Sequence, residues 1–151
     1  MHSWIEIDTK AIQNNLSFFQ KKAFPAETMP VLKSNAYGHG LKEVYESIKN
    51  LKPKTIGVNC LLEANQLIEL GYKGEVLIMG PIFSKDIATA AKTNTTLTIS
   101  HIETLKTWLD LKIKPNIHIK IDTGLSRQGF SLQEIKEIIP KLPPYKKNIQ
   151  A

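Results

Sequence analysis

Cysteine is almost missing from the sequence, which has a single one, Cys60, among 151 residues. One thiol cannot form a disulfide within the chain, which agrees with a cytoplasmic protein. Cys60 has no histidine or second cysteine at metal-ligand spacing, so we expect no metal site. The start, MHSWIEID, has neither the basic nor the apolar region of a signal peptide, and the cytoplasm is therefore the expected location.

Long apolar runs are also missing, since none approaches the ~20 residues that a membrane-spanning helix needs. The composition, 42% hydrophobic and 23% charged, is that of a soluble globular protein, and the length suits one domain. The formal charge of +6 comes from lysines spread thinly along the chain. Because no basic stretch is interleaved with aromatic residues, we expect no nucleic-acid partner and no membrane partner.

The hydrophobic pattern alternates between short β-rich runs and helix-period segments, which predicts βαβ units and a parallel sheet. The expected strands are Met29 to Lys33, Thr55 to Asn59, Glu75 to Met79, Thr95 to Ile99 and Ile117 to Ile121. A first helix with Ile12, Leu16, Phe19 and Ala23 on one side precedes them. Ser100 with Glu103 and Ser131 with Glu134 fit the capping box at two helix starts, and Gly71 is a plausible helix end.

The spacing of about 20 to 25 residues per unit suits a (β/α)8 barrel as well as an open doubly wound sheet. The chain is too short for a complete barrel, which usually needs ~250 residues. Its last residues, Asn148 to Ala151, look like the beginning of another strand.

The first stretch that could carry chemistry is KSNAYGHG, residues 33–40. Lys33 ends a predicted strand, where sites collect in α/β folds, and a partly neutral amine there could attack a carbonyl and form a Schiff base. Gly38 and Gly40 would let the backbone approach a ligand, and Tyr37 could donate to a phosphate. A solvated lysine at a strand end is the alternative, and His39 is more simply structural.

The second stretch is NIHIKIDTGLSRQG, residues 116–129. Its alternation places His118, Lys120 and Asp122 on the face opposite the isoleucines. In a buried parallel strand such a face must line a polar site, whereas an exposed antiparallel strand would explain it without function. Arg127 follows a turn and could offer a fork of donors to a carboxylate or a phenolate.

Together these stretches resemble the alanine racemases, pyridoxal-phosphate (PLP) enzymes with a (β/α)8 barrel followed by a β-rich C-terminal domain. The resemblance rests on WIEID at 4–8, VLKSNAYGHG at 31–40 and KIDTGLSRQG at 120–129. It implies an α/β fold: a partial (β/α)8 barrel of about five to six βα units, without the C-terminal β domain. Residues 1–151 would be the N-terminal portion of the barrel domain.

The resemblance also implies roles for individual residues. Lys33 would hold PLP and act as the base for the D-alanine face, and Tyr37 would bind the cofactor phosphate. Arg127 would contact the substrate carboxylate and the phenolic oxygen of PLP, with Lys120 orienting it and with His118 and Asp122 in support. The implied reaction interconverts L- and D-alanine and supplies D-alanine for peptidoglycan.

The family acts as a homodimer in which a tyrosine of the partner subunit's C-terminal domain is the second base, and this chain has no counterpart. We therefore expect the 151-residue chain alone to have little or no racemase activity and to be prone to aggregation. The alternatives are another PLP barrel, such as a cofactor carrier or an amino-acid decarboxylase, and a non-catalytic remnant or interaction module.

Overall fold

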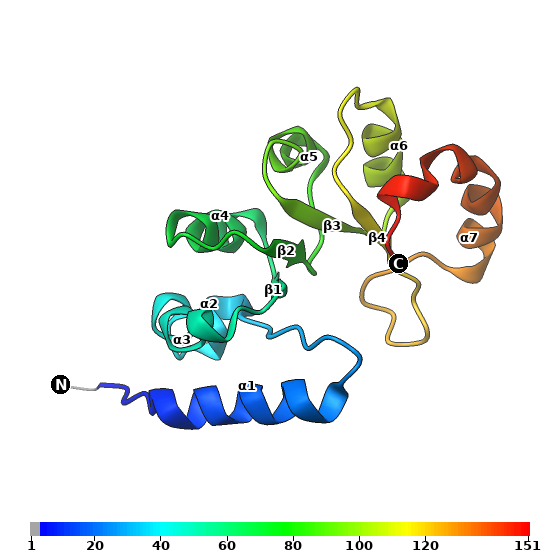
Figure 1. Cartoon of the computed structure of the whole chain (residues 1–151). Coiled ribbons are helices and arrows are strands. Elements are labelled where there is room, and N and C mark those ends of the chain that lie inside the picture. Colours follow the sequence, from blue (N-terminus) through cyan, green and yellow to red (C-terminus); the bar gives the residue numbers. More distant parts are fainter. Residues whose placement is uncertain (1–3) are drawn as a thin grey trace. The chain divides into compact units, whose positions relative to one another are not determined.

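A computed structural model describes residues 4–151, and the first three residues of the stretch MHSWIEID lie outside the described residues. The chain divides into two compact units, Met1–Val76 and Leu77–Ala151. Figure 1 shows the order of the helices and strands along the chain. Within residues 4–151, four strands form one sheet in the order of the chain, β1-β2-β3-β4. Strand β2, Glu75–Ile78, spans the boundary between the units.

The first unit consists mainly of helices, with the short strand β1 and a β-bridge at Val31. Its elements are α1 Thr9–Ala23, α2 Lys33–Tyr37, α3 Leu41–Ile48, the 3-10 helix η1 Lys49–Leu51, β1 Thr55–Val58 and α4 Leu61–Glu69. Helix α1 begins where the Asp8 side chain accepts a hydrogen bond of 3.0 Å from the backbone N–H of Ala11. Gly71, at φ 90°, follows α4 as predicted, and its N–H caps the carbonyl of Ile68.

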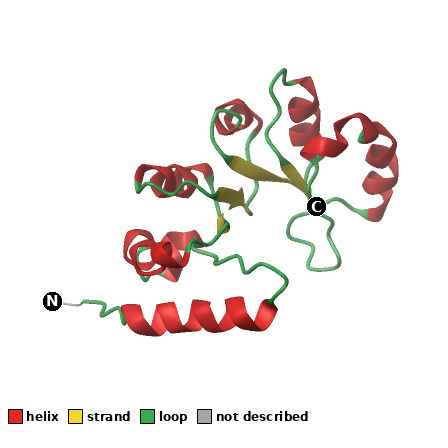
Figure 2. Cartoon of the chain, viewed as in Figure 1, coloured by secondary structure: helices red, strands yellow, loops and turns green. Residues whose placement is uncertain are grey.

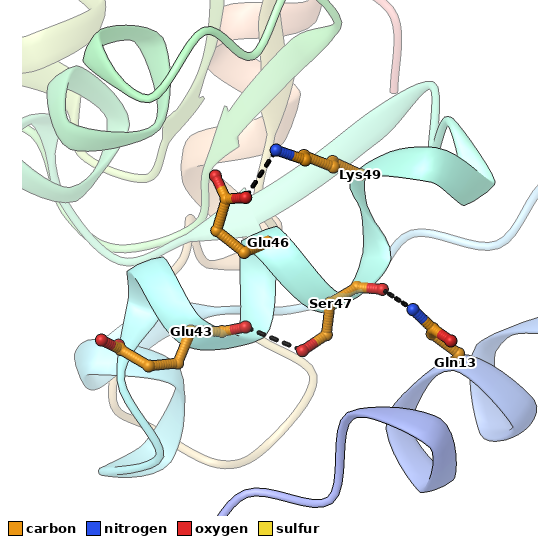
Figure 3. A network of polar contacts seen from close by, with 5 residues as sticks. All are labelled: Gln13, Glu43, Glu46, Ser47 and Lys49. Carbon is orange, nitrogen blue, oxygen red and sulfur yellow. Dashed lines mark hydrogen bonds and ion pairs between the residues drawn. The ribbon is translucent and has the colours of Figure 1, made fainter.

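Helix α1 packs against α3, and a hydrogen bond from Gln13 joins α1 to α3 (Figure 3). The Gln13 side-chain amide donates to the backbone carbonyl of Ser47 at 2.8 Å, and the Ser47 hydroxyl donates to the carbonyl of Glu43 at 2.8 Å. Lys49 pairs with Glu46 at 2.5 Å. Of the predicted apolar side of α1, Leu16 is buried, while Phe19 is 56% exposed, so that expectation holds only in part.

The predicted strand Met29–Lys33 is wrong in extent, because only Val31 forms a parallel bridge, to Gly57 of β1. Two backbone hydrogen bonds hold it, from Leu32 N–H to the Gly57 carbonyl and from Gly57 N–H to the Pro30 carbonyl, at 2.8 and 2.9 Å. Pro30 has no N–H to donate, and the chain turns into α2 at Lys33, so the ladder cannot lengthen.

The second unit repeats the βα order (Figure 2). Its elements are α5 Ser84–Ala90, β3 Thr95–Ile99, α6 Ile102–Asp110, β4 Ile117–Ile119, α7 Leu132–Ile138, η2 Ile139–Lys141 and η3 Pro143–Asn148. Strands β3 and β4 are parallel, with Leu97 opposite Ile117 and Ile99 opposite Ile119. The predicted strands of this unit are thus present, although β4 is two residues shorter than expected.

One of the two predicted capping boxes is present. The Ser131 hydroxyl accepts from the backbone N–H of Glu134 at 3.3 Å, and the Glu134 carboxylate accepts from the N–H of Ser131 at 2.8 Å. The box at Ser100 is wrong, because α6 begins one residue later, with His101 as its cap residue and no side-chain cap bond.

The last residues, 148–151, which the sequence predicted to begin another strand, form only an isolated bridge beside β4, and Asn148 still belongs to η3. Ile149 forms a parallel bridge to Ile117, and the N–H of Ile119 donates to the carbonyl of Ala151 at 2.7 Å. Trp108 is fully buried, and its indole N–H donates to the Pro115 carbonyl at 3.0 Å. No helix within residues 4–151 is both long and apolar enough to span a bilayer.

Candidate functional site

Lys33 begins a turn of unusual handedness. The four residues after it all have left-handed backbone angles, with φ between 52° and 56°, and they are Ser34, Asn35, Ala36 and Tyr37. None is glycine, and the left-handed conformation costs about 1–2 kcal/mol for each such residue. Strain of this kind persists only where the surroundings enforce it, and it gathers at functional sites.

Neighbouring polar groups hold this left-handed turn in place. The amide oxygen of the Asn35 side chain accepts from the N–H of Leu41, at the start of α3, at 2.7 Å. The Glu63 carboxylate, from α4, accepts from the backbone N–H of Asn35 at 3.2 Å. Gly38 and Gly40, at φ 88° and 94°, continue the positive angles where glycine is needed. The turn therefore has a fixed geometry despite its strain.

Lys33 and Tyr37 lie close together across the left-handed turn. The Lys33 amine lies 5.8 Å from the centroid of the Tyr37 ring. Lys33 is half-buried, whereas the Tyr37 side chain is 60% exposed, so its phenol is accessible. This arrangement gives one primary amine and one phenolic donor on the same short turn.

His39 has a local hydrogen bond that favours the structural interpretation. Its Nδ1 lies 2.9 Å from the carbonyl oxygen of Ala36, and its own backbone N–H donates to that oxygen at 3.1 Å. Both bonds close the end of the left-handed turn.

In the second unit, β4 presents its predicted polar face. The antiparallel alternative is wrong, because β4 pairs in parallel with β3, with Thr98 opposite His118. Paired residues of parallel strands point to the same face, so Thr98 and His118 share one face, and Ser100 and Lys120 follow on it. Thr98 and Ser100 are buried, at 7% and 3% exposure. In TTLTIS, residues 95–100, Thr96, Thr98 and Ser100 alternate with apolar residues. This alternation indicates the polar face of β3, which was not among the predictions.

The loop after β4 is organised by Asp122. Its Oδ1 accepts from the backbone N–H of Gly124 at 2.9 Å and from that of Ser126 at 3.1 Å. These two bonds lower the pKa of Asp122 below its ordinary value, and the Lys120 charge adds to the effect. Ser126 has a left-handed φ of 54°, and the next residue, Arg127, is exposed. The Arg127 guanidinium is thus presented to solvent from a structured loop.

The far end of the same loop is tied to β3 and β4. Gln128 donates from its side-chain amide to the Ser100 hydroxyl at 3.2 Å, and that hydroxyl lies 2.9 Å from Nδ1 of His101. Phe130 is fully buried and forms two backbone hydrogen bonds with the residues that follow β4. Its N–H donates to the carbonyl of Lys120 at 2.8 Å, and its carbonyl accepts from the N–H of Asp122 at 3.0 Å.

The predicted site residues therefore fall into two groups. Lys33 and Tyr37 lie together in the unit Met1–Val76, and His118, Lys120, Asp122 and Arg127 lie along one strand and loop of the unit Leu77–Ala151. Glu63, Ser100 and Gln128, which hold the two segments, were not predicted. Within residues 4–151, no group of three or more histidine, cysteine, aspartate or glutamate side chains could hold a metal ion.

Comparisons with known proteins give one consistent result. Residues 7–149 match the family model described as alanine racemase, N-terminal domain. Alanine racemase of Fusobacterium nucleatum is 35% identical over 139 residues, which is 92% of this chain and 39% of the relative. That of Listeria monocytogenes strain 10403S is 36% identical over 134 residues, or 87% of this chain and 36% of the relative.

Solved structures agree with the sequence relatives. Alanine racemase from Corynebacterium glutamicum superposes with a TM-score of 0.87 at 31% identity, over 97% of this chain and 43% of its own. A histidine racemase from Leuconostoc mesenteroides subsp. sake gives 0.78 at 26% identity, over 93% of this chain and 39% of its own. The chain spans about two fifths of the length of these relatives. It belongs to the alanine racemase family, within the N-terminal part of that family's barrel.

Proposed function

We propose that this chain belongs to a PLP-dependent racemase that interconverts L- and D-alanine and supplies D-alanine for peptidoglycan. Residues 1–151 are then the N-terminal portion of its PLP-binding barrel domain. The observation that carries the proposal is Lys33 at the head of a strained, non-glycine left-handed turn, with Tyr37 on the same turn. Family membership over residues 7–149 supports it independently.

The residues present fit the chemistry of PLP. Lys33 offers a half-buried primary amine for the cofactor's aldehyde, and Tyr37 offers an exposed phenol for its phosphate. When bound, PLP draws electrons from the substrate and so makes its Cα proton more acidic. Lys33 then moves that proton on one face of Cα, as a base.

Arg127 has the second role in this proposal. Its guanidinium is always charged and carries a planar fork of donors, which matches a substrate carboxylate or a phenolic oxygen of the cofactor. Asp122 holds the loop that carries Arg127, and Lys120 and His118 set the charge and polarity of the adjoining strand face. The arginine binds and orients, and takes no proton at neutral pH.

Racemisation needs a second proton carrier on the opposite face of Cα. By resemblance this is a tyrosine in the C-terminal domain of a partner subunit, so we propose a homodimer as the active form. The isolated 151-residue chain should accordingly bind PLP with little or no racemase activity. We also propose a cytoplasmic location, with which the single cysteine of the chain agrees.

Reductive trapping tests the cofactor site. The purified chain is incubated with PLP and reduced with borohydride, and tryptic peptides are mapped by mass spectrometry. We expect the pyridoxyl group on Lys33 and its loss in Lys33→Ala, with Lys49→Ala as a control that removes an exposed lysine of the same unit. Labelling spread evenly over surface lysines would contradict the proposal.

Proton exchange tests the reaction. D-alanine is incubated with the PLP-loaded chain in D2O, because Lys33 is proposed as the base for the D-alanine face, and loss of the Cα proton is followed by NMR together with the formation of L-alanine. Exchange without L-alanine is expected if Lys33 works alone. Decarboxylation of the amino acid would favour the decarboxylase alternative, and no reaction at Cα would favour a carrier or a non-catalytic module.

A second substrate is a candidate because a structural neighbour, that of Leuconostoc mesenteroides subsp. sake, is a histidine racemase. The same exchange experiment with a panel of D-amino acids, histidine included, decides between them. Fastest exchange with alanine is the expected outcome.

A further inference from the structure

Glu63 connects the left-handed turn to the end of β1. Its Oε1 accepts from the backbone N–H of Asn35 at 3.2 Å, and its Oε2 accepts from the backbone N–H of Asn59 at 2.8 Å. Asn59 directly follows β1, whose Gly57 is bridged to Val31 just before Lys33. One carboxylate thus bridges the two chain segments at the point where they leave the sheet.

The backbone N–H of Asn35 has a different kind of acceptor from the other backbone donors of the left-handed turn. Ala36 and Gly38 donate to backbone carbonyls of the turn and its entry, Leu32 for Ala36 and both Ser34 and Asn35 for Gly38. Asn35 instead donates to a side chain from another helix. Since the turn is strained at every position from Ser34 to Tyr37, it depends on contacts from outside to persist.

A role for Glu63 limited to its own helix would be simpler. Glu63 lies in the first turn of α4, and the Asn59 contact alone would satisfy a free donor at that helix start. The second oxygen goes beyond this role, because Asn35 lies 28 residues away and belongs to neither α4 nor β1. The two contacts also use both oxygens, which an amide side chain cannot imitate, since it has one acceptor.

We propose that Glu63 is a positioning residue that fixes the left-handed turn and thereby the direction of the Lys33 side chain. The inference deepens the proposed function, because it names what holds the cofactor-binding lysine in place. Glu63 itself touches neither cofactor nor substrate in this proposal. It acts on Lys33 through the backbone of Asn35, two residues further along the chain.

Hydrogen exchange of the chain without PLP tests the structural part. Glu63→Gln keeps the size of the side chain but leaves one acceptor for two donors, and we expect peptides covering residues 33–40 to exchange at least about tenfold faster. Glu69→Gln is the matched control, since Glu69 is an exposed glutamate at the other end of α4, and it should leave these peptides unchanged. Peptides of α6 should be unaffected in both variants.

Two further variants keep the test decisive. If Glu63→Gln fails to fold, Glu63→Asp serves in its place, because it keeps the charge but is one methylene too short to reach both amides. Adding Ser34→Gly removes the left-handed penalty at Ser34, so the double variant Glu63→Gln/Ser34→Gly should recover part of the lost protection. Faster exchange confined to residues 59–69, with residues 33–40 unchanged, would overturn the proposal and leave Glu63 as a helix cap.

The link to the cofactor has its own measurement. The rate at which PLP becomes trapped on Lys33 by borohydride should fall about tenfold or more in Glu63→Gln and stay unchanged in Glu69→Gln. Equal trapping rates in the wild type and Glu63→Gln would refute the positioning of Lys33. If the wild-type chain takes up no PLP at Lys33, the proposed function fails, while the exchange data still decide whether Glu63 holds the turn.

Discussion

The backbone N–H of Ser126 donates a hydrogen bond of 3.1 Å to Oδ1 of Asp122, which also accepts from Gly124. A side chain at the end of β4 thus holds a residue with a left-handed φ of 54°, immediately before Arg127. The position of the arginine depends on a carboxylate five residues earlier in the chain.

Replacing Asp122 by alanine should release this loop. We expect the amides of Gly124 and Ser126 to lose protection in hydrogen exchange, while Asp122→Asn, which keeps an acceptor oxygen, retains most of it. Peptides of β3 serve as the internal reference. Unchanged exchange of the Ser126 amide in Asp122→Ala would show that other contacts hold the loop.

The same carboxylate should give a pH dependence. The hydrogen bonds from Gly124 and Ser126 lower the pKa of folded Asp122 below its value in the unfolded chain. Its contribution to stability is therefore present above the unfolded pKa of about 3.9 and is lost as the pH falls through the folded pKa. Urea unfolding of the wild type and Asp122→Asn from pH 2 to 6 should show the wild type losing more stability on acidification. Parallel pH profiles would contradict this.

Two glycines of this loop should differ sharply when changed to alanine. Both have positive φ, 127° at Gly124 and 138° at Gly129, so each substitution carries backbone strain. A Cβ at Gly124 meets nothing within 4 Å, whereas one at Gly129 would lie 2.4 Å from the Asp122 nitrogen. Because backbone atoms cannot step aside, Gly129→Ala should cost about 1–3 kcal/mol more than Gly124→Ala in chemical unfolding. Equal costs would mean that the loop can shift as a whole.

Much of the fold was readable from periodicity because buried parallel strands have a simple local signal. The predicted strand at Thr95–Ile99 matches β3. The alternation of His118 and Lys120 predicted a polar face of the next strand, and β3, its parallel partner, places Thr98 on the same face opposite His118. The capping box at Ser131 was equally local, since its two partners are three residues apart.

The errors have nonlocal causes. Ser100 matched the capping pattern, but its hydroxyl bonds to Gln128, which lies 28 residues further on. The segment before Lys33 has strand composition, yet the left-handed turn stops it after a single bridge at Val31. No local pattern predicts four left-handed non-glycine residues in a row. The contacts that hold them, from Asn35 to Glu63 of α4 and to Leu41 of α3, form only in the folded chain.

The capping box of α7 offers a direct test of helix stability. Ser131→Ala removes the acceptor for the Glu134 N–H and should destabilise the protein by about 1 kcal/mol in chemical unfolding. Ser131→Asn, which can also cap, should retain most of the stability. A cost as large for asparagine as for alanine would mean that the reciprocal bond from the Ser131 hydroxyl to Glu134 matters more than the cap.

Tyr72 should stabilise the first unit through its hydroxyl as well as its ring. The ring is 7% exposed and packs edge-on against Tyr45 with centroids 5.9 Å apart. The hydroxyl lies 2.9 to 3.2 Å from three carbonyl oxygens, those of Lys54, Pro53 and Glu75. Tyr72→Phe leaves these carbonyls, that of the buried Pro53 among them, without this donor and should lower the free energy of unfolding by about 1–2 kcal/mol. Tyr145→Phe is the control, because that ring likewise packs edge-on against an aromatic partner, Trp108.

The hydroxyl of Tyr72 should also limit stability at alkaline pH. Burial, reinforced by the Glu75 charge, raises the pKa of folded Tyr72 above its unfolded value. A raised pKa means that the stabilisation is complete below the unfolded value of about 10 and is lost as the pH rises towards the folded pKa. Unfolding measured from pH 8 to 11 should therefore show the wild type losing stability faster than Tyr72→Phe. If the two curves stay parallel above pH 10, Tyr72 ionises in the folded protein as easily as in the unfolded chain, and its hydroxyl is not held as the three carbonyl contacts require.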